Sequence, residues 1–562
     1  METIRSVSAT RSLRFYQDPY LWGVWLLISL GLLIIGWGLS YPVLYAASEI
    51  PVMQQVSLVF WVGLWLSLIG LGSWVTTARS SVVPWLASIL FVVVLTAPQF
   101  LYVGWGSDAG NLAEMTNYAR SVSSFNLARD ISTVSYFQWP ASIFYHRFLL
   151  DAFNIDSYAA AKLGMLLTCF CVGSGIYLLA RRQQPGLRAS RAAFWSVVMY
   201  FAGFYWFFNW QATPYSFALA LFIPALALIE QIDLSHRILL LLIVVVGLES
   251  HALFGVWLIL ISAGLIGLTL LRRARRPRLS WALLALLVVA QVALIIYKNT
   301  QFLHSIYLNA SGYYNALLEL GASDRAVARQ VDLALNNTPP DLLGQVLKFL
   351  GYMNLQLSAI IFLLAVILIL RYRKLRNWDL SLLAAGGCYF AVGVVFAAIG
   401  TRALQLIALP LVFFIAEALQ LPGKSSSVIA GLCVISLLLF PSSLIRSYQT
   451  GGNYVRPLDL AVRDFTGSTV TGLAGNTFIL GEGVRPIAMN LIHQIISPST
   501  ASYWPQCAGA AIIIDSRQLR DRLTANQSRI SQMPAQVSTV YDAGLIKIRA
   551  LRECRPLLEA LK

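Results

Sequence analysis

The sequence has few charged residues for its length. Only 12% of its 562 residues are Asp, Glu, Lys or Arg, whereas 58% are hydrophobic, and the mean hydropathy is +0.68. Soluble domains carry about 25% charged residues, so this composition excludes a soluble globular protein of any size. The chain is therefore expected to be an integral membrane protein.

The sequence also lacks the motifs of several well-defined enzyme classes. It contains no glycine-rich phosphate-binding loop, no HExxH, no paired CxxC and no GxSxG. Nothing therefore indicates ATP hydrolysis, the use of a nucleotide sugar in the cytoplasm or a structural metal. No motif predicts metal ligands, and a requirement for a divalent cation stays open. No internal repeat or low-complexity tract is present either.

Cysteine is scarce as well. The six cysteines are too few for a disulfide framework. Four of them lie inside apolar runs and are expected to be small core residues, namely Cys169, Cys171, Cys388 and Cys433. The other two, Cys507 and Cys554, lie in the C-terminal segment, where a disulfide between them is one alternative if that segment is outside the cytoplasm.

What the sequence does contain is a series of long apolar runs. A membrane span needs about 20 apolar residues, and about 13 runs are candidates. Their centres lie near residues 31, 64, 92, 169, 200, 221, 243, 260, 289, 360, 389, 411 and 436. The basic N-terminus shows no short apolar core with a cleavage site, so no removable signal peptide is expected. We predict a polytopic α-helical membrane protein with about 13 transmembrane helices.

Basic residues indicate the orientation. The net charge is +16, from 41 Lys and Arg against 25 Asp and Glu, but the basic clusters at 181–191, 272–278 and 371–376 lie between apolar runs. This is typical of cytoplasmic loops, so no nucleic-acid partner is expected. An N-terminus inside puts every basic cluster between spans on the cytoplasmic side of the cytoplasmic (plasma) membrane. The same alternation puts the loops 104–158 and 299–350 outside.

The segment after about residue 446 also falls outside, and its pattern differs. TFILGEG, AAIIIDS and VSTVYDAGLIKIRAL have the length of strands, with YDAG as a hairpin turn, and helix-like stretches RPIAMNLIHQII and SRQLRDRLTAN lie between them. We therefore predict a transmembrane domain over 1–445 and a small extracytoplasmic α/β domain over 446–562. The loop 299–350 is expected to form one or two amphipathic helices at the interface.

Asp108 opens the loop 104–158, the first long segment too polar to span a membrane. The glycine and other small residues around it, in WGSDAGN, allow a tight backbone at the membrane surface. A carboxylate there can act as a general base that deprotonates an acceptor hydroxyl, so that the oxygen attacks a sugar carbon and displaces a lipid phosphate. The alternative is a helix cap in SDAGNLAEM, and the two roles are compatible.

Aromatic and basic residues gather further along the same loop. Trp139-Pro140 is followed by Tyr145, His146 and Arg147. Rings beside a positive charge suit a sugar face or a phosphate, so Trp139, Tyr145, His146 and Arg147 are candidate substrate-binding residues. The alternative for the aromatic residues is the interfacial belt of a membrane protein.

Two polar residues interrupt a pair of apolar runs in GLESHALFG. Ionisable side chains between two membrane spans are energetically unfavourable, so Glu249 and His251 are expected to have a functional role or to face a water-filled cavity. Both are expected at membrane-surface depth, on the same side as Asp108. Glu249 is a second candidate catalytic carboxylate, and His251 is a candidate substrate-binding residue. The alternative is a simple exposed turn.

Arg402, in IGTRALQLIAL, is an isolated charge at an outer boundary. A guanidinium there can bind a phosphate with two hydrogen bonds while the lipid chain enters the bilayer; snorkelling to lipid headgroups is the alternative. Lys298, just before the loop 299–350, and His304, within it, are further candidates for substrate binding, although an ordinary surface position is the favoured explanation.

The layout resembles the GT-C superfamily of polytopic glycosyltransferases, and the residues that carry the resemblance are WGSDAGN, Trp139-Pro140, Glu249, Arg402 and the loop 299–350. The resemblance implies a polyprenyl- or dolichyl-phosphate-linked sugar donor, transfer outside the cytoplasm and inversion at the anomeric carbon. It also implies Asp108 as the base and Arg402 as a ligand of the lipid phosphate. The resemblance leaves open whether the acceptor is a glycan, a lipid or a protein. It implies a role in glycan biosynthesis of the cell envelope.

Some features depart from that pattern. The acidic loop follows the third predicted span, whereas it follows the first in many GT-C enzymes, so the chain is expected to carry an N-terminal hairpin of two spans added to a shared core. The WWDxG-like motif of oligosaccharyltransferases is absent, which argues against transfer to asparagine. Arabinosyltransferases and lipid A aminoarabinose transferases are looser relatives in layout.

Two other classes stay open as alternatives. A lipid or glycan transporter has a similar number of spans, but it usually carries polar residues at mid-membrane depth and a repeated half. An O-antigen ligase or polymerase also joins lipid-linked glycans outside, although its decisive loop normally lies late in the chain.

Overall fold

The computed structural model describes residues 18–42, 55–103, 107–121, 139–181, 186–203, 212–228, 234–271, 289–290, 293, 363, 377–395, 405–414, 476–480, 495–496, 511–515, 537–542 and 547–551. Several sequence predictions lie outside these residues: Lys298, His304, Arg402, Cys433, Cys507, Cys554, the loop 299–350 and the spans centred at 360 and 436.

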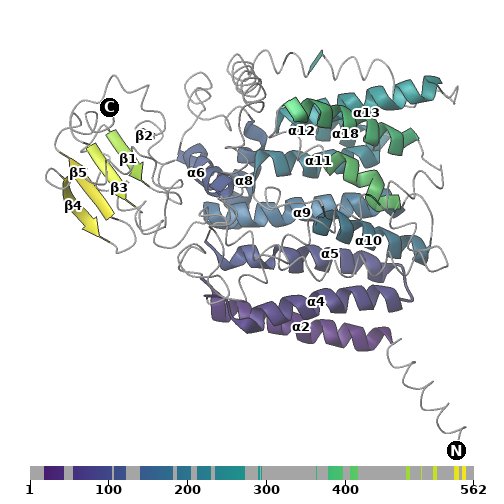
Figure 1. Ribbon diagram of the computed structural model, residues 1–562, viewed down its shortest axis with the longest axis horizontal. Coiled ribbons are helices and arrows are strands. Elements are labelled where there is room, and N and C mark those ends of the chain that lie inside the picture. The colour runs from purple at the N-terminus through teal and green to yellow at the C-terminus, as the bar shows by residue number, and fades with distance from the viewer. Residues whose placement is uncertain are drawn as a thin grey trace, which may run out of the picture.

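Apolar helices lie side by side and form most of the described structure (Figure 1). They occupy the predicted span centres from 31 to 260 and those at 389 and 411. The elements are α2 (Pro19–Ser40), α4 (Leu58–Thr77), α5 (Val82–Thr96), the 3-10 helix η1 (Ala97–Leu101), α9 (Ser157–Arg181), α10 (Leu187–Gly203), α11 (Pro214–Leu228), α12 (Leu234–Leu248), α13 (Ala252–Leu271), α18 (Asn377–Val395) and a helical segment at 405–414.

Four of the described segments are long and apolar enough to cross a membrane: Pro19–Ser40, Leu58–Thr77, Val82–Leu101 and Ser157–Arg181. Large apolar side chains on their outer surfaces, such as Leu27 and Ile34 of α2, are exposed. An exposed apolar surface is favourable in lipid and unfavourable in water. The bundle is therefore that of an integral membrane protein, as the composition predicts.

Helix starts follow local rules. Asp18 precedes α2 and its carboxylate accepts a hydrogen bond from the Tyr20 N–H at 3.0 Å, with Pro19 at the first helical position. Ser57 precedes α4 and its hydroxyl accepts from the Val59 N–H at 3.2 Å. These residues determine where each helix begins.

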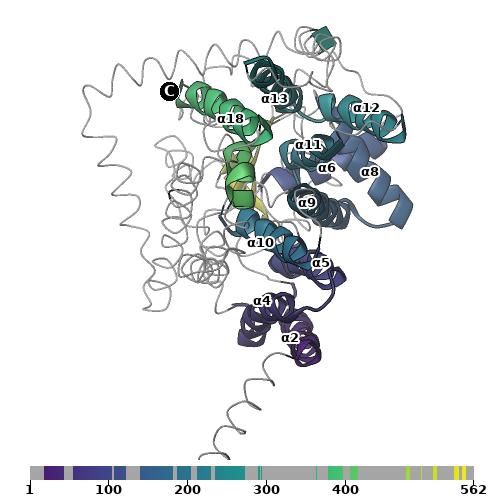
Figure 2. The same cartoon turned by 90° about the vertical axis from the view of Figure 1, so that its right-hand side faces the viewer.

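Glycine allows α2 and α4 to pack backbone against backbone. A Cβ atom on Gly36 would overlap the backbone of Phe60, and one on Gly63 would overlap the backbone of Leu33. The two helices therefore form a tight hairpin, which packs through α4 on α5 (Figure 2). The N-terminal hairpin is thus present, and its origin as an addition to a shared core stays a prediction.

The prediction for the cysteines is only partly right. Cys169 is buried in the core, whereas Cys171 and Cys388 are exposed. Helix α9 is apolar on all sides, so hydropathy alone does not distinguish a core-facing position from one on the outer surface of the bundle.

Two less apolar helices lie at one end of the bundle, α6 (Ser107–Ser121) and α8 (Pro140–Phe153) (Figure 1). They come from the polar loop predicted at 104–158, and α9 already begins at Ser157. Helix α6 packs on α8 and α9, and α8 packs on α9. The loop thus contributes helices that rest on the end of the bundle.

The C-terminal segment contains four strands where the sequence predicts them, β1 (Asn476–Leu480), β3 (Ala511–Asp515), β4 (Val537–Asp542) and β5 (Lys547–Leu551). A fifth strand, β2 (Ile495–Ile496), was not predicted. The five strands form a sheet of order β2-β1-β3-β5-β4, with β1 parallel to β2 and β3, and β5 antiparallel to β3 and β4. Figure 1 shows this sheet beyond the same end of the bundle as α6 and α8.

One detail of the C-terminal prediction is wrong. The last two residues of the helix-like stretch RPIAMNLIHQII, Ile495 and Ile496, form β2 and pair with Thr477 and Phe478. A parallel partner strand overrides a weak helical pattern in β-branched residues. The remaining helical stretches lie outside the described residues, so the α/β domain as a whole stays a prediction.

The glycine contact in the hairpin can be tested by adding bulk. Gly36→Val is expected to force α2 away from Phe60 and to destabilise the protein by about 1–3 kcal/mol, as overpacking does. Gly31→Val, on the same helix with open space at its Cβ position, is the matched control. Thermal unfolding of both purified variants in detergent measures the difference; equal melting temperatures would contradict the tight hairpin.

Candidate active site

Trp139 and His251 stack on each other, although they are far apart in the chain. Their ring centroids lie 6.1 Å apart with an interplanar angle of 28°, and Trp139 is buried. The Ala141 N–H also donates to the Glu249 carbonyl oxygen at 3.3 Å. The start of α8 is thereby attached to the turn between α12 and α13, which brings two segments selected from the sequence together.

The turn is built to present His251. Helix α12 ends at Leu248, and the Ser250 hydroxyl donates to the Gly247 carbonyl oxygen at 2.6 Å. The Nδ1 atom of His251 accepts a hydrogen bond from the Leu253 N–H at 3.1 Å, at the start of α13. Since Nδ1 accepts, the neutral imidazole carries its proton on Nε2.

Tyr215, from α11, packs edge-on against His251 with ring centroids 5.6 Å apart. Its hydroxyl donates a hydrogen bond to the Oε1 atom of Gln405, and both side chains are buried. Gln405 begins the helical segment 405–414 and follows Arg402 by three residues. The start of the segment 405–414 is therefore held beside the Trp139–His251 pair, while Arg402 lies outside the described residues.

Tyr145 lies deeper along α8. Its ring stacks on Phe217 with centroids 4.7 Å apart, and its hydroxyl donates to the Gly164 carbonyl oxygen at 3.3 Å. Burial raises the pKa of the Tyr145 hydroxyl. The side chain therefore acts as a neutral donor that joins α8 to α9 and α11, and its predicted contact with substrate stays a prediction.

His146 is fully buried against α9. Its Nδ1–H donates to the Ser142 carbonyl oxygen at 2.6 Å, and its Nε2 atom faces Gly164 and has no hydrogen-bond partner among the described residues. Burial lowers the pKa of His146 to about 4, so the imidazole is neutral at physiological pH. Its substrate-binding role stays a prediction, and its observed contacts are with protein.

Arg147 connects α8 to α6. Its Nη1 donates to the Ala119 carbonyl oxygen at 2.5 Å, and its Nε lies 3.5 Å from the Asp151 carboxylate, which also lies 3.8 Å from Arg120. These groups are partly exposed, so the ion pairs contribute little energy. The bond to the last turn of α6 nevertheless holds that helix in place.

Asp108 is the second residue of α6. The first turn of a helix carries unpaired N–H groups and a partial positive charge, which favour a carboxylate there. A position inside the first turn is compatible with both interpretations of the sequence, base and cap. The described part of Asp108 is its backbone, and the role of its carboxylate stays a prediction.

The sequence did not predict three residues near the end of the bundle where α6 and α8 lie, namely Lys162, Tyr215 and Gln405. Lys162 lies in α9 and its Nζ donates to the Tyr102 carbonyl oxygen at 3.2 Å. A lysine inside an apolar run of span length was a signal that could have selected it. Tyr215 and Gln405 carried no such signal, because each is an ordinary polar residue at the edge of an apolar run.

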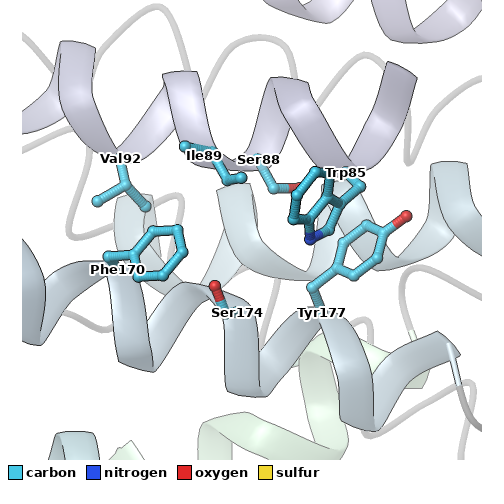
Figure 3. A pocket seen from close by; sticks show the side chains of 7 residues that line it. All are labelled: Trp85, Ser88, Ile89, Val92, Phe170, Ser174 and Tyr177. Atoms are coloured by element: carbon cyan, nitrogen blue, oxygen red, sulfur yellow. The ribbon is translucent and has the colours of Figure 1, made fainter. Parts of the chain in front are cut away.

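A shallow crevice between α5 and α9 lies apart from these residues (Figure 3). Its lining residues are Trp85, Ser88, Ile89, Val92, Phe170, Ser174 and Tyr177. Trp85 lies in the first turn of α5, whose other end leads toward α6, so the crevice does not belong to the candidate site. Within the described part of the chain, no group of three His, Cys, Asp or Glu side chains lies close enough to hold a metal.

Comparisons with known proteins give structural similarities only. No family model and no curated protein sequence matches the chain. ArnT from Cupriavidus metallidurans in the apo state is similar with a TM-score of 0.46 and 14% identity, over 84% of this chain and 98% of that one. The archaeal oligosaccharyltransferase AglB from Archaeoglobus fulgidus, in complex with an inhibitory peptide and a dolichol-phosphate, gives 0.40 and 11%, over 76% and 69%.

A second structure of the Archaeoglobus fulgidus oligosaccharyltransferase, tethered to an acceptor peptide with the NVT sequon, also has a TM-score of 0.40 and 11% identity, over 73% of this chain and 63% of that one. These proteins are GT-C glycosyltransferases, the class that the sequence resembles. At such identities and TM-scores the similarity by itself assigns no activity to this chain.

The burial of His146 leads to a prediction about pH. Its pKa is about 4 in the folded protein against 6.5 when unperturbed, so neutral His146 contributes about 3 kcal/mol above pH 6.5, which is lost as the pH falls toward 4. The melting temperature of the wild type is expected to fall more between pH 7 and pH 5 than that of His146→Gln. Thermal unfolding in detergent at both pH values measures this difference, and parallel decreases would contradict it.

Proposed function

We propose that this chain is a GT-C type membrane glycosyltransferase that moves a sugar from a polyprenyl-phosphate donor to an extracytoplasmic acceptor. The observation that carries the proposal is the convergence of Trp139, the turn with Glu249 and His251, and Gln405 at the start of the segment 405–414. They meet at the end of an apolar bundle where α6, the helix of Asp108, also packs. A lipid-linked substrate presents its phosphate and sugar at this depth.

The proposed reaction is a single displacement. The Asp108 carboxylate takes the proton of an acceptor hydroxyl as its oxygen forms a bond to the anomeric carbon. The bond between that carbon and the phosphate oxygen breaks, and the polyprenyl phosphate leaves with both electrons. One displacement inverts the anomeric configuration, and the proton remains on Asp108 until it passes to solvent. Glu249, in the turn after α12, is the second candidate catalytic carboxylate at the same end of the bundle.

Other residues bind the substrate in this proposal. Arg402 pairs with the phosphate, because a planar guanidinium matches two phosphate oxygens. The Trp139–His251 pair offers aromatic surface and a ring N–H for the sugar. Lys298, just before the loop 299–350, and His304, within it, provide a further rim. Tyr145, His146 and Arg147 attach α8 to the neighbouring helices.

The orientation in the membrane belongs to the same proposal. About 13 spans with the N-terminus in the cytoplasm put α6, α8 and a C-terminal α/β domain on the outer side. The arrangement of the basic residues supports this, because the Arg191 Nη2 atom donates to the Ala78 carbonyl oxygen at 2.7 Å. The basic clusters at Arg79 and 181–191 therefore lie together, at the opposite end of α5 from η1 and α6.

Asp108→Asn tests the base. The variant is expected to lower sugar transfer from a polyprenyl-phosphate donor by about 100- to 10,000-fold, because an amide does not accept the proton. Glu114→Gln, on the same helix, is the matched control and should keep its activity. Transfer of a radiolabelled sugar in proteoliposomes measures both, and full turnover in Asp108→Asn would eliminate Asp108 as the base.

Arg402→Ala tests the phosphate contact. We expect the KM for the lipid-linked donor to rise by about tenfold or more while the fold is retained, because one bidentate charge-assisted contact is lost. Arg120→Ala, an exposed arginine at the same end of the bundle, is the control. An unchanged donor KM in Arg402→Ala argues for snorkelling to lipid headgroups instead.

A further inference from the structure

Two side chains from different helices donate hydrogen bonds to the backbone just ahead of α6. The indole Nε1–H of Trp37, near the end of α2, donates to the Phe100 carbonyl oxygen at 3.1 Å. The ammonium group of Lys162, near the start of α9, donates to the Tyr102 carbonyl oxygen at 3.2 Å. Tyr102 precedes Asp108 by only six residues.

Both acceptors are carbonyl groups that need a partner. The helix η1 ends at Leu101, and the last carbonyl groups of a helix find no N–H donor within the helix itself. An unpaired carbonyl in apolar surroundings is unfavourable by several kcal/mol, so a donor that reaches it holds the backbone firmly. Trp37 and Lys162 hold carbonyls two residues apart, one donor from α2 and the other from α9.

Aromatic contacts fix the two donors themselves. The Lys162 Nζ atom lies 5.8 Å from the ring centroid of Tyr41 and 5.9 Å from that of Phe100. Tyr41 stacks on Trp37 with centroids 5.0 Å apart. Trp37, Tyr41, Phe100 and Lys162 thus form one lysine–aromatic cluster that joins α2, η1 and α9.

We propose that Trp37 and Lys162 are positioning residues for Asp108, because they hold the Phe100 and Tyr102 carbonyls and so determine where α6 begins. The role of Asp108 in this inference rests on the proposed function. The inference gives the N-terminal hairpin a part in catalysis: α2 is an element of the positioning machinery in addition to being a membrane span.

Single substitutions of the two donors, made in the full-length protein in nanodiscs, test the proposal. Trp37→Phe and Lys162→Met remove one donor each and keep most of the side-chain bulk. Both are expected to lower kcat by about 10- to 100-fold with little change in the donor KM, as misplacement of a reacting group does. Lys162→Arg, which keeps a donor, should recover most of the rate.

The chain offers a matched control on the same helix. Trp25 is also partly exposed and donates its indole Nε1–H to a backbone carbonyl, that of Leu66 in α4, at 3.3 Å. Trp25→Phe therefore loses an equivalent hydrogen bond within the hairpin, far from α6. It should leave kcat unchanged.

Hydrogen exchange of the peptide covering α6 is the readout that does not depend on activity. Faster exchange in the first turns of α6 is expected for Trp37→Phe and Lys162→Met, and wild-type exchange for Trp25→Phe and Lys162→Arg. If the first two variants exchange like the wild type, or raise the donor KM alone, the positioning role is overturned. A wild type that transfers no sugar while this exchange pattern holds would refute the proposed function and leave the positioning of α6 intact.

Discussion

Backbone carbonyls at the ends of helices need hydrogen-bond donors, and long side chains from other helices supply them in this bundle. Lys162 reaches Tyr102, Trp37 reaches Phe100, Arg147 reaches Ala119 and Arg191 reaches Ala78. Water satisfies such groups where they are exposed, but inside a hydrocarbon layer only protein donors are available. The same bonds that relieve this shortage also determine which helix ends lie next to each other.

The candidate site is a consequence of these attachments. The bond from Ala141 to Glu249 joins α8 to the turn after α12, and the bond from Tyr215 to Gln405 joins α11 to the segment 405–414. The stacked pair of Trp139 and His251 lies between these two bonds. Hydrogen bonds and ring stacking between helix ends thus hold the described part of the candidate site together.

The sequence was a good guide to which segments matter and a poor guide to what individual side chains do. Trp139 and His251 were selected separately and prove to be in contact. His146 was selected for the same reason as Trp139, yet it faces Gly164 in the core, because an amphipathic helix has a buried face whose phase a short motif does not reveal. Lys162 was overlooked although its charge inside an apolar run was visible.

The sequence by itself determined that this is an integral membrane protein, where the described apolar helices lie and where four of the five described strands near the C-terminus lie. Hydropathy and charge act along the chain, so they specify how deep each residue lies in the membrane and in what order the spans cross it. Only the tertiary structure decided which residues at one depth are neighbours, such as Tyr215 with Gln405 and Lys162 with Tyr102. Lateral packing of helices that are apolar on every side depends on shape and on glycine contacts, and neither leaves a periodic signal in the chain.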